Sequence, residues 1–133
     1  MVIGIGIDIV DLDEFRERLT DELVCEVFLP GEIEYASSQA RPWEQFAARF
    51  AAKEAVFKAL GDGLAQGLTW KDVEVLRGPS GKIALRLAGR ALGMAEGRGI
   101  TALRLSIAHS KKSAVAVVIV EGAAQPLGQG GSR

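Results

Sequence analysis

The longest helical segment constrains the fold of this chain most. The sequence predicts a helix over residues 43–60, because Pro42 favours a helix start and Gly61 a helix stop. At about 100° per residue, the phenylalanines of this segment lie on one face and the alanines on another. These residues are Phe46, Phe50 and Phe57, and Ala48, Ala52, Ala55 and Ala59. A helix with two apolar faces is mostly buried, and its alanines allow a neighbouring element to approach closely.

The same helix carries Glu54 and Lys58, which lie on one face because they are four residues apart. One interpretation is an ordinary ion pair on a solvated surface, which stabilises a helix by only ~0.3–0.5 kcal/mol. The burial expected for the helix favours a second interpretation, in which Glu54 is partly withdrawn from water. A carboxylate and a lysine in that setting can hold a metal ion and a phosphate group.

The first strand, predicted over residues 2–10, carries an aspartate beside two glycines. Side chains alternate along a strand, so one face is entirely isoleucine and is predicted to be core. Its residues are Ile3, Ile5, Ile7 and Ile9. The opposite face carries Gly4, Gly6 and Asp8, and glycine inside a strand often marks the close approach of a ligand or another backbone. Alternatively, the glycines accommodate a packed helix and Asp8 caps the helix that starts near Asp11. A dinucleotide-binding loop is excluded, because Ile9 stands where the third glycine belongs.

The remaining pattern indicates an α+β fold, with a mostly antiparallel sheet packed against the long central helix. Further helices are predicted over residues 11–28, 32–38 and 88–98, and two hairpins over 72–87 and 102–121. The prediction is one domain over residues 1–121, followed by a disordered tail over residues 122–133 that is rich in Gly, Gln and Pro.

The last strand is apolar on both faces. Residues 114–120 read AVAVVIV, whereas an antiparallel strand usually has one polar, solvated face. Either another subunit covers the outer face of the sheet or a helix does. The first interpretation predicts an oligomer.

Composition excludes several classes of protein. The chain has 133 residues, 48% of them hydrophobic, which suits one folded domain. Met1 leads straight into a strand and no apolar run approaches the ~18–20 residues that span a bilayer, so the prediction is a cytoplasmic protein without membrane contact. The single cysteine, Cys25, is predicted to be buried, and with one histidine it makes no zinc site. No basic cluster is interleaved with aromatics, which argues against nucleic acid.

Three segments together resemble the holo-acyl-carrier-protein synthases, the small type of 4′-phosphopantetheinyl transferase. Residues 5–8 read Ile-Gly-Ile-Asp, residues 50–58 read Phe-Ala-Ala-Lys-Glu-Ala-Val-Phe-Lys, and residues 105–110 read Leu-Ser-Ile-Ala-His-Ser. The resemblance runs over about residues 1–121 in the expected order. It implies Mg²⁺-dependent transfer of phosphopantetheine from coenzyme A to a serine of an acyl carrier protein, with release of 3′,5′-ADP, by a homotrimer.

The resemblance also implies roles for individual residues. Asp8 and Glu54 are expected to bind Mg²⁺, and Glu54 and Lys58 to be catalytic. Lys58 is further expected to contact the phosphates, with three other substrate-binding residues. These are Gly61, His109 and Ser110. The general base for the serine proton stays open between a water molecule at the metal, Glu54 and Lys58.

Carrier docking is where this sequence departs from the family pattern. The family's first helix is often rich in arginine, yet residues 1–40 contain ten acidic and only two basic residues, and Glu14 stands where a basic residue is frequent. Arg16, Arg18 and Arg49 are the candidates for docking the carrier, with Arg41 and Lys53 as further ones. The alternative function is a non-catalytic oligomeric module that binds a nucleotide or a carrier protein and keeps the motif for structure.

Overall fold

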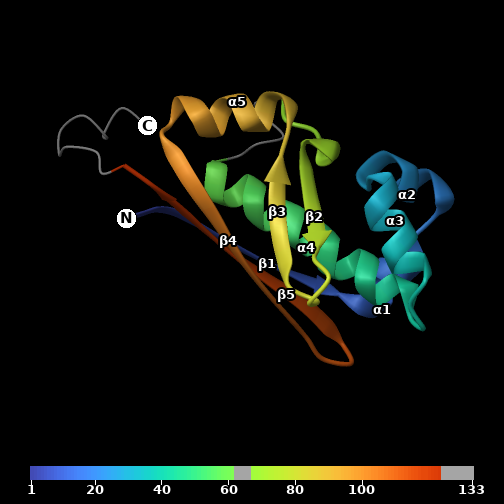
Figure 1. Cartoon of the computed structure of the whole chain (residues 1–133). Helices are drawn as coiled ribbons and strands as arrows, with labels where there is room; N and C mark the ends of the chain where they lie inside the picture. The colour runs from blue at the N-terminus through green and yellow to red at the C-terminus, as the bar shows by residue number, and fades with distance from the viewer. Residues whose placement is uncertain (62–66, 124–133) are drawn as a thin grey trace.

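The computed structural model describes residues 1–61 and 67–123 (Figure 1). These residues form five strands, five α-helices and a short 3-10 helix, η2. In chain order they are β1 (Val2–Asp11), α1 (Leu12–Arg18), α2 (Asp21–Val27), α3 (Pro30–Ser37), α4 (Pro42–Leu60), η2 (Trp70–Asp72), β2 (Val73–Arg77), β3 (Ile83–Leu87), α5 (Gly89–Gly97), β4 (Ile100–His109) and β5 (Ser113–Gly122). The predicted α+β class with antiparallel strands and a long central helix is confirmed.

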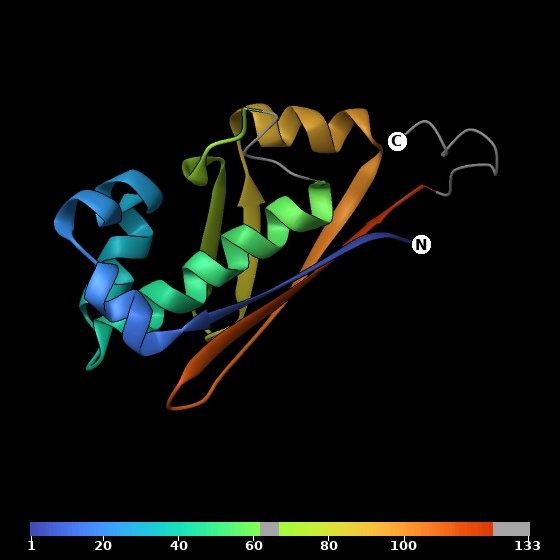
Figure 2. The same cartoon turned by 180° about the vertical axis from the view of Figure 1, so that it is seen from behind.

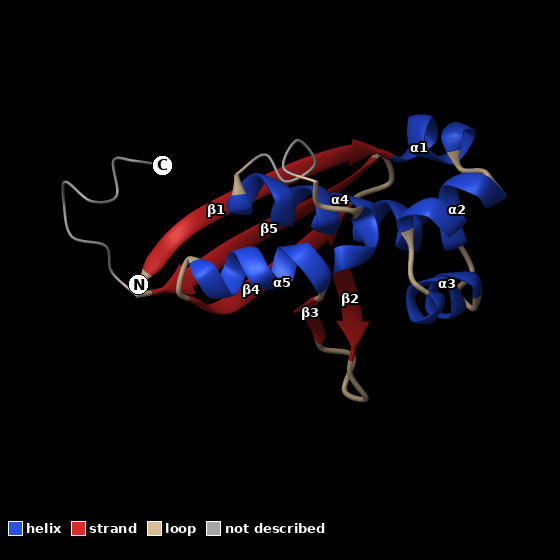
Figure 3. Cartoon of the chain, turned by 90° about the horizontal axis from the view of Figure 1, so that it is seen from above, coloured by secondary structure: helices blue, strands red, loops and turns tan. Residues whose placement is uncertain are grey.

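The strands form two antiparallel sheets. The larger sheet has the order β1-β5-β4, so the last strand lies in its centre, and β2 pairs with β3 in a separate hairpin. In the larger sheet, Asp8 lies opposite Ala116 and Ile7 opposite Val117. Figures 1 and 3 show α4 running along β1 and β5, while α1, α2 and α3 gather at one end of the molecule. Figure 2 shows the same arrangement from behind.

The close packing of α4 on β1 requires the two glycines of this strand. A Cβ atom at Gly6 would lie 1.9 Å from the carbonyl oxygen of Ala55, and one at Gly4 would lie 2.8 Å from that of Ala59. No side chain fits in those spaces, so the two backbones meet through glycine on one side and alanine on the other. The prediction that the alanine face of α4 admits a close neighbour is confirmed, and the neighbour is β1.

A buried ion pair joins α3, α4 and β2. The Lys53 ammonium lies 2.8 Å from Oε1 of Glu32, and both side chains are fully buried. Lys53 also donates to the carbonyl of Trp70, while the Glu32 carboxylate accepts from the backbone N–H groups of Leu29 and Val75. Every charge is therefore compensated, which a buried ion pair requires if it is not to destabilise the fold. The suggestion that Lys53 docks a carrier protein is wrong, because its ammonium does not reach the surface.

Three further predictions need correction. The isoleucine face of β1 is exposed in the single chain: Ile5 is 64% and Ile9 67% accessible, because the glycine face packs on α4 instead. The predicted helix over residues 11–28 is two helices, because the Thr20 side chain accepts from the N–H of Leu23 and starts α2. Cys25 is exposed.

The described residues contain no helix that combines the length and the apolar content needed to cross a bilayer. The last strand, β5, ends at Gly122, one residue beyond the predicted domain boundary. The predicted tail falls largely on residues 124–133, which lie outside the described part of the chain.

Candidate active site

A pocket of about 280 Å³ lies where β1, α1 and α4 meet. Its walls combine carboxylates and cations with two phenylalanines. The lining residues are Asp8, Ile9, Val10, Asp11, Glu14, Phe15, Arg18, Phe50, Glu54 and Lys58. All three residues that the sequence placed at the centre of the chemistry, Asp8, Glu54 and Lys58, line this pocket together.

The contact of β1 with α4 determines where Asp8 lies. Because Gly6 lets the strand approach the helix backbone, the next residue on the same strand face, Asp8, lies beside α4 at the level of Lys58. Asp8 does not cap the following helix. That role belongs to Asp11, whose carboxylate accepts from the N–H of Glu14 at 2.9 Å. The Asp8 carboxylate is therefore available to the pocket.

Lys58 pairs with Asp8 rather than with its helix neighbour. Its ammonium lies 3.0 Å from the Asp8 carboxylate and donates to the carbonyl of Ile7 at 3.1 Å. The Lys58 side chain is about half exposed, while that of Asp8 is largely covered. Among the ion pairs of residues 1–61 and 67–123, none joins Lys58 to Glu54. The ordinary i,i+4 pair considered from the sequence is thus replaced by a contact between strand and helix.

Glu54 is the most electrostatically perturbed acid of the pocket. Burial raises the pKa of the Glu54 carboxyl, the negative charge of Asp8 raises it further, and the Lys58 ammonium opposes them. No hydrogen bond found within the described ranges involves its carboxylate. Glu54 is thus a partly buried carboxylate next to a second carboxylate, and a bound cation would offset the repulsion between them.

The donor set fits Mg²⁺ better than a metal that needs an all-protein site. The described residues hold no cluster of three or more acidic, histidine or cysteine side chains around one point. Mg²⁺ commonly binds one or two carboxylates and completes its shell with water and substrate phosphate. Asp8 and Glu54 line the same pocket and could supply two hard oxygen ligands to such an ion.

The other predicted substrate-binding residues lie outside this pocket in the single chain. Gly61 ends α4 with a φ of 83°, and its N–H donates to the carbonyl of Lys58. His109 and Ser110 are exposed at the turn between β4 and β5. That turn lies beside the start of α1, where the Lys112 carbonyl accepts from the N–H of Leu12. Residues 62–66, which follow Gly61, lie outside the described part of the chain.

The three arginines proposed for carrier docking lie in three different settings. Arg18 lines the pocket beside the metal candidates. The guanidinium of Arg16 stacks on the ring of Trp43, 3.6 Å from its centroid. Arg49 is only 4% exposed and faces away from this pocket, so its guanidinium is not presented on the α1 surface. Arg18 is the best placed of the three to meet a partner at the pocket mouth.

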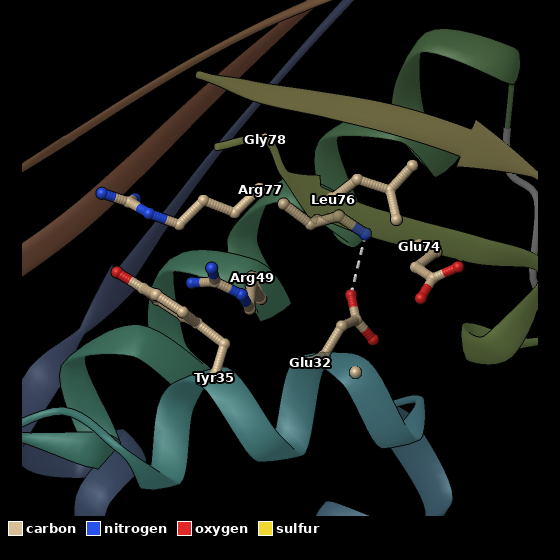
Figure 4. A pocket seen from close by; sticks show the side chains of 9 residues that line it. Glu32, Tyr35, Arg49, Glu74, Leu76, Arg77 and Gly78 are labelled. Carbon is tan, nitrogen blue, oxygen red and sulfur yellow. Dashed lines mark hydrogen bonds between the residues drawn. The ribbon is translucent and has the colours of Figure 1, made fainter. Parts of the chain in front are cut away.

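A second pocket, of about 390 Å³, lies between α3, α4 and β2 and was not predicted (Figure 4). Figure 4 shows Tyr35, Arg49 and Arg77 on one side of it and Glu32 and Glu74 on the other. Of its lining residues, the sequence had singled out Arg49, as a candidate for carrier docking. The segments that bring Tyr35 and Arg77 to it could not be placed from the sequence alone.

Sequence comparison identifies the family. The chain matches the 4′-phosphopantetheinyl transferase superfamily over residues 4–117. It is 46% identical to the holo-[acyl-carrier-protein] synthase of Syntrophus aciditrophicus, covering 92% of this chain and 98% of that protein. It is 44% identical to the enzyme of that name from Geobacter sulfurreducens, covering 91% and 98%. The chain therefore belongs to the 4′-phosphopantetheinyl transferase superfamily, as its motifs predict.

Solved structures agree in fold. The Chronobacterium ammoniagenes ACPS–CoA complex superposes with a TM-score of 0.80 at 27% identity, covering 91% of this chain and 98% of that one. A holo-(acyl-carrier-protein) synthase from Bacillus anthracis, in complex with CoA (3′,5′-ADP), superposes with a TM-score of 0.76 at 34% identity, covering 92% and 99%. Both solved relatives hold coenzyme A or a part of it.

Proposed function

We propose that this chain transfers the 4′-phosphopantetheine group of coenzyme A to a serine of an acyl carrier protein. The observation that carries the proposal is the convergence of Asp8, Glu54 and Lys58 in one solvent-open pocket, in a chain of this family. The relatives named for that activity span nearly the whole chain. The cytoplasmic location expected from the sequence stays a prediction.

The reaction is a phosphoryl transfer. The serine oxygen forms a bond to the phosphorus that carries pantetheine, the bond from that phosphorus to the bridging diphosphate oxygen breaks, and 3′,5′-ADP leaves while the serine hydroxyl gives up its proton. Such transfers need charge neutralisation on the phosphate oxygens and alignment of the nucleophile, because little covalent chemistry is left to the protein. A pocket with cations and metal-binding carboxylates at its wall suits that task.

Asp8 and Glu54 would hold the Mg²⁺ ion, which would neutralise charge on the diphosphate when bound. Glu54 must be ionised for this role. Because its pKa is raised, the metal-free site becomes fully charged at a higher pH than an ordinary carboxyl group would require. Without a cation, the two carboxylates repel each other. A bound cation would offset this repulsion, and that gain favours its binding.

Lys58 supplies a partly exposed positive charge at the same pocket. Its side chain is about half exposed, and its ammonium contacts Asp8 and one backbone carbonyl, so it can turn toward a phosphate without leaving a fully buried group unpaired. A cation at this place stabilises the charge that develops on the leaving diphosphate oxygen. We assign it to phosphate binding in the transition state.

The outer face of the larger sheet supports the proposal of a homotrimer. The exposed isoleucines of β1 lie beside the outward residues of β5, and together they form an apolar face that the described residues leave partly exposed. The residues are Ile3, Ile5, Ile7, Ile9, Val115, Val117 and Ile119. A continuous apolar sheet face on a small protein indicates a protein interface. We propose further copies of this chain as its occupant, three in all by resemblance to the family.

The direct test is mass spectrometry of a carrier protein. The chain is mixed with coenzyme A, Mg²⁺ and an apo-carrier protein, and the carrier is weighed. The expected result is a mass gain of one phosphopantetheine, together with 3′,5′-ADP in the supernatant. An unmodified carrier, with intact binding of coenzyme A, would favour the non-catalytic binding module instead. A panel of fatty-acid and polyketide carriers then defines the acceptor.

A further inference from the structure

The buried ion pair of Lys53 and Glu32 lies outside the pocket of the candidate active site and takes no direct part in the proposed reaction. The Lys53 ammonium lies 2.8 Å from the Glu32 carboxylate, and neither side chain is exposed. The ammonium also donates to the carbonyl oxygens of Trp70 at 3.1 Å and Val73 at 2.5 Å. An ammonium group has three N–H donors, so each donor has an acceptor. The buried cation is therefore held in one orientation.

The Glu32 carboxylate is held just as closely. It accepts from the N–H of Leu29 at 2.9 Å, at the start of its own helix, and from the N–H of Val75 at 2.9 Å, on β2 (Figure 4). These hydrogen bonds connect α4 to α3, to η2 and to β2. A buried ion pair adds little net stability, because desolvation of the two charges offsets their attraction, whereas its hydrogen bonds have a strict geometry. The pair thus fixes the position of α4 more than it stabilises the fold.

The residue that follows Lys53 is Glu54, and α4 is held on both sides of it. Successive residues of a helix are about 100° apart around its axis. Lys53 is held on one side, and Ala55, roughly 200° further round, packs against Gly6 of β1. Glu54 lies between these two contacts and lines the pocket. Because α4 cannot turn about its axis without breaking one of the contacts, they set the direction of Glu54.

We propose that Lys53 and Glu32 are positioning residues, which hold α4 in the rotation that brings the Glu54 carboxylate into the pocket with Asp8. They act through Glu54 and touch no reacting group. A binding site needs its side chains held within about 0.5 Å of the productive geometry by the contacts that support them. Loss of the ion pair should therefore weaken metal binding beyond what its effect on stability explains. The metal-binding part of this inference rests on the proposed function.

Three variants separate positioning from stability. The double variant Lys53→Gln with Glu32→Gln replaces the ion pair by neutral side chains of similar size that can still form hydrogen bonds. Glu32→Asp keeps both charges and shortens the carboxylate side chain by one methylene, so it carries the test if the double variant does not fold. Val120→Ala is the control. Val120 is a core residue of β5, 1% exposed, that does not line the pocket, so its truncation lowers stability and leaves the ion pair in place.

The first measurement needs neither metal nor coenzyme A. Glu54→Gln is introduced into the wild type and into each of the three variants, and the melting temperatures are compared in metal-free buffer at one neutral pH. In the wild type, removal of the charge beside Asp8 is expected to raise the melting temperature. If the ion pair positions Glu54, that gain should fall by roughly half or more in the ion-pair variants and persist in Val120→Ala. The same gain in every background would overturn the proposal.

The second measurement is the Mg²⁺ concentration that gives half-maximal carrier modification. The ion-pair variants should need roughly tenfold more Mg²⁺, as is typical when the support of a metal ligand is removed, with the KM for the carrier unchanged. Val120→Ala should need no more than the wild type. An equal rise in Val120→Ala would reduce the pair to a structural role and contradict the proposal. If the wild type modifies no carrier, the proposed function fails, and the melting temperatures still decide whether the pair positions Glu54.

Discussion

Adjacent residues of α4 have opposite roles. Lys53 points into the protein and is completely buried with Glu32, whereas Glu54 points to the pocket beside Asp8. One residue step turns a helix by about 100°, so neighbours in the sequence face different partners. The four-residue spacing placed Glu54 and Lys58 on one helix face, and both line the pocket. It could not predict that Lys53 is buried, because the compensating Glu32 lies 21 positions away in the chain.

The raised pKa of Glu54 predicts a pH-dependent effect of removing its charge. An acid whose pKa is higher in the folded than in the unfolded state destabilises the fold above the folded pKa, and this destabilisation disappears as the pH falls through it. In metal-free buffer, Glu54→Gln should therefore raise the melting temperature at neutral pH, and the gain should shrink toward acid pH. Thermal melts of both proteins across pH check this. A variant that melts lower than the wild type at every pH would contradict the assignment.

At the scale of elements, the decisive contact is that of β1 with α4. The sequence indicated both the strand and the helix, and it left open whether the glycines served a ligand or a helix. The structure shows that they serve the helix, and that this contact is also what positions Asp8 at the pocket. The wrong assignment of the isoleucine face has the same origin. Periodicity identifies two faces of a strand but not which of them the helix covers, and the larger side chains misled the prediction.

Gly6→Ala should destabilise the protein strongly. The new Cβ atom would lie 1.9 Å from the Ala55 carbonyl, so strand and helix must separate, and overpacking of this kind typically destabilises a protein by about 1–3 kcal/mol or more. Gly93→Ala is the matched control, because nothing lies within 4 Å of its Cβ position inside α5. It should stabilise the fold by about 0.5–1 kcal/mol. Urea denaturation compares the two, and equal effects would refute the packing argument.

At the scale of the whole molecule, the central position of β5 in the larger sheet explains why this last strand is apolar on both faces. Its even-numbered residues from Ala114 to Val120 are buried under α4, and its odd-numbered residues face outward with the isoleucines of β1. The sequence left two explanations, another subunit or a helix. The apolar character of both faces is explained if α4 covers the inner face and further copies of the chain cover the outer one. The register that brings Ile7 beside Val117 could not be derived from periodicity, because it depends on the long connection between β1 and β5.

Substitutions at two neighbouring valines of β5 would distinguish an effect on folding from an effect on assembly. Val118 is fully buried in the core, so Val118→Asp should unfold the chain, since an unpaired buried charge is severely unfavourable. Val117 lies on the outer face, so Val117→Asp should leave the secondary structure intact and dissociate the proposed homotrimer. Light scattering and circular dichroism measure the two properties. A wild type that is monomeric at micromolar concentration would exclude the homotrimer.

The central claim is that Asp8 and Glu54 together hold Mg²⁺ for phosphopantetheine transfer, and a magnesium titration of carrier modification tests it most directly. Glu54→Gln keeps the size and polarity of the side chain and removes one charge from the site. Asp8→Asn makes the equivalent change on β1. Glu44→Gln is the control on the same helix, because Glu44 pairs with Arg41 outside the pocket. The account predicts a much lower kcat and a higher Mg²⁺ requirement for both pocket variants, with the control like the wild type and melting temperatures not reduced. Full activity of Glu54→Gln at ordinary Mg²⁺ concentration would contradict the account.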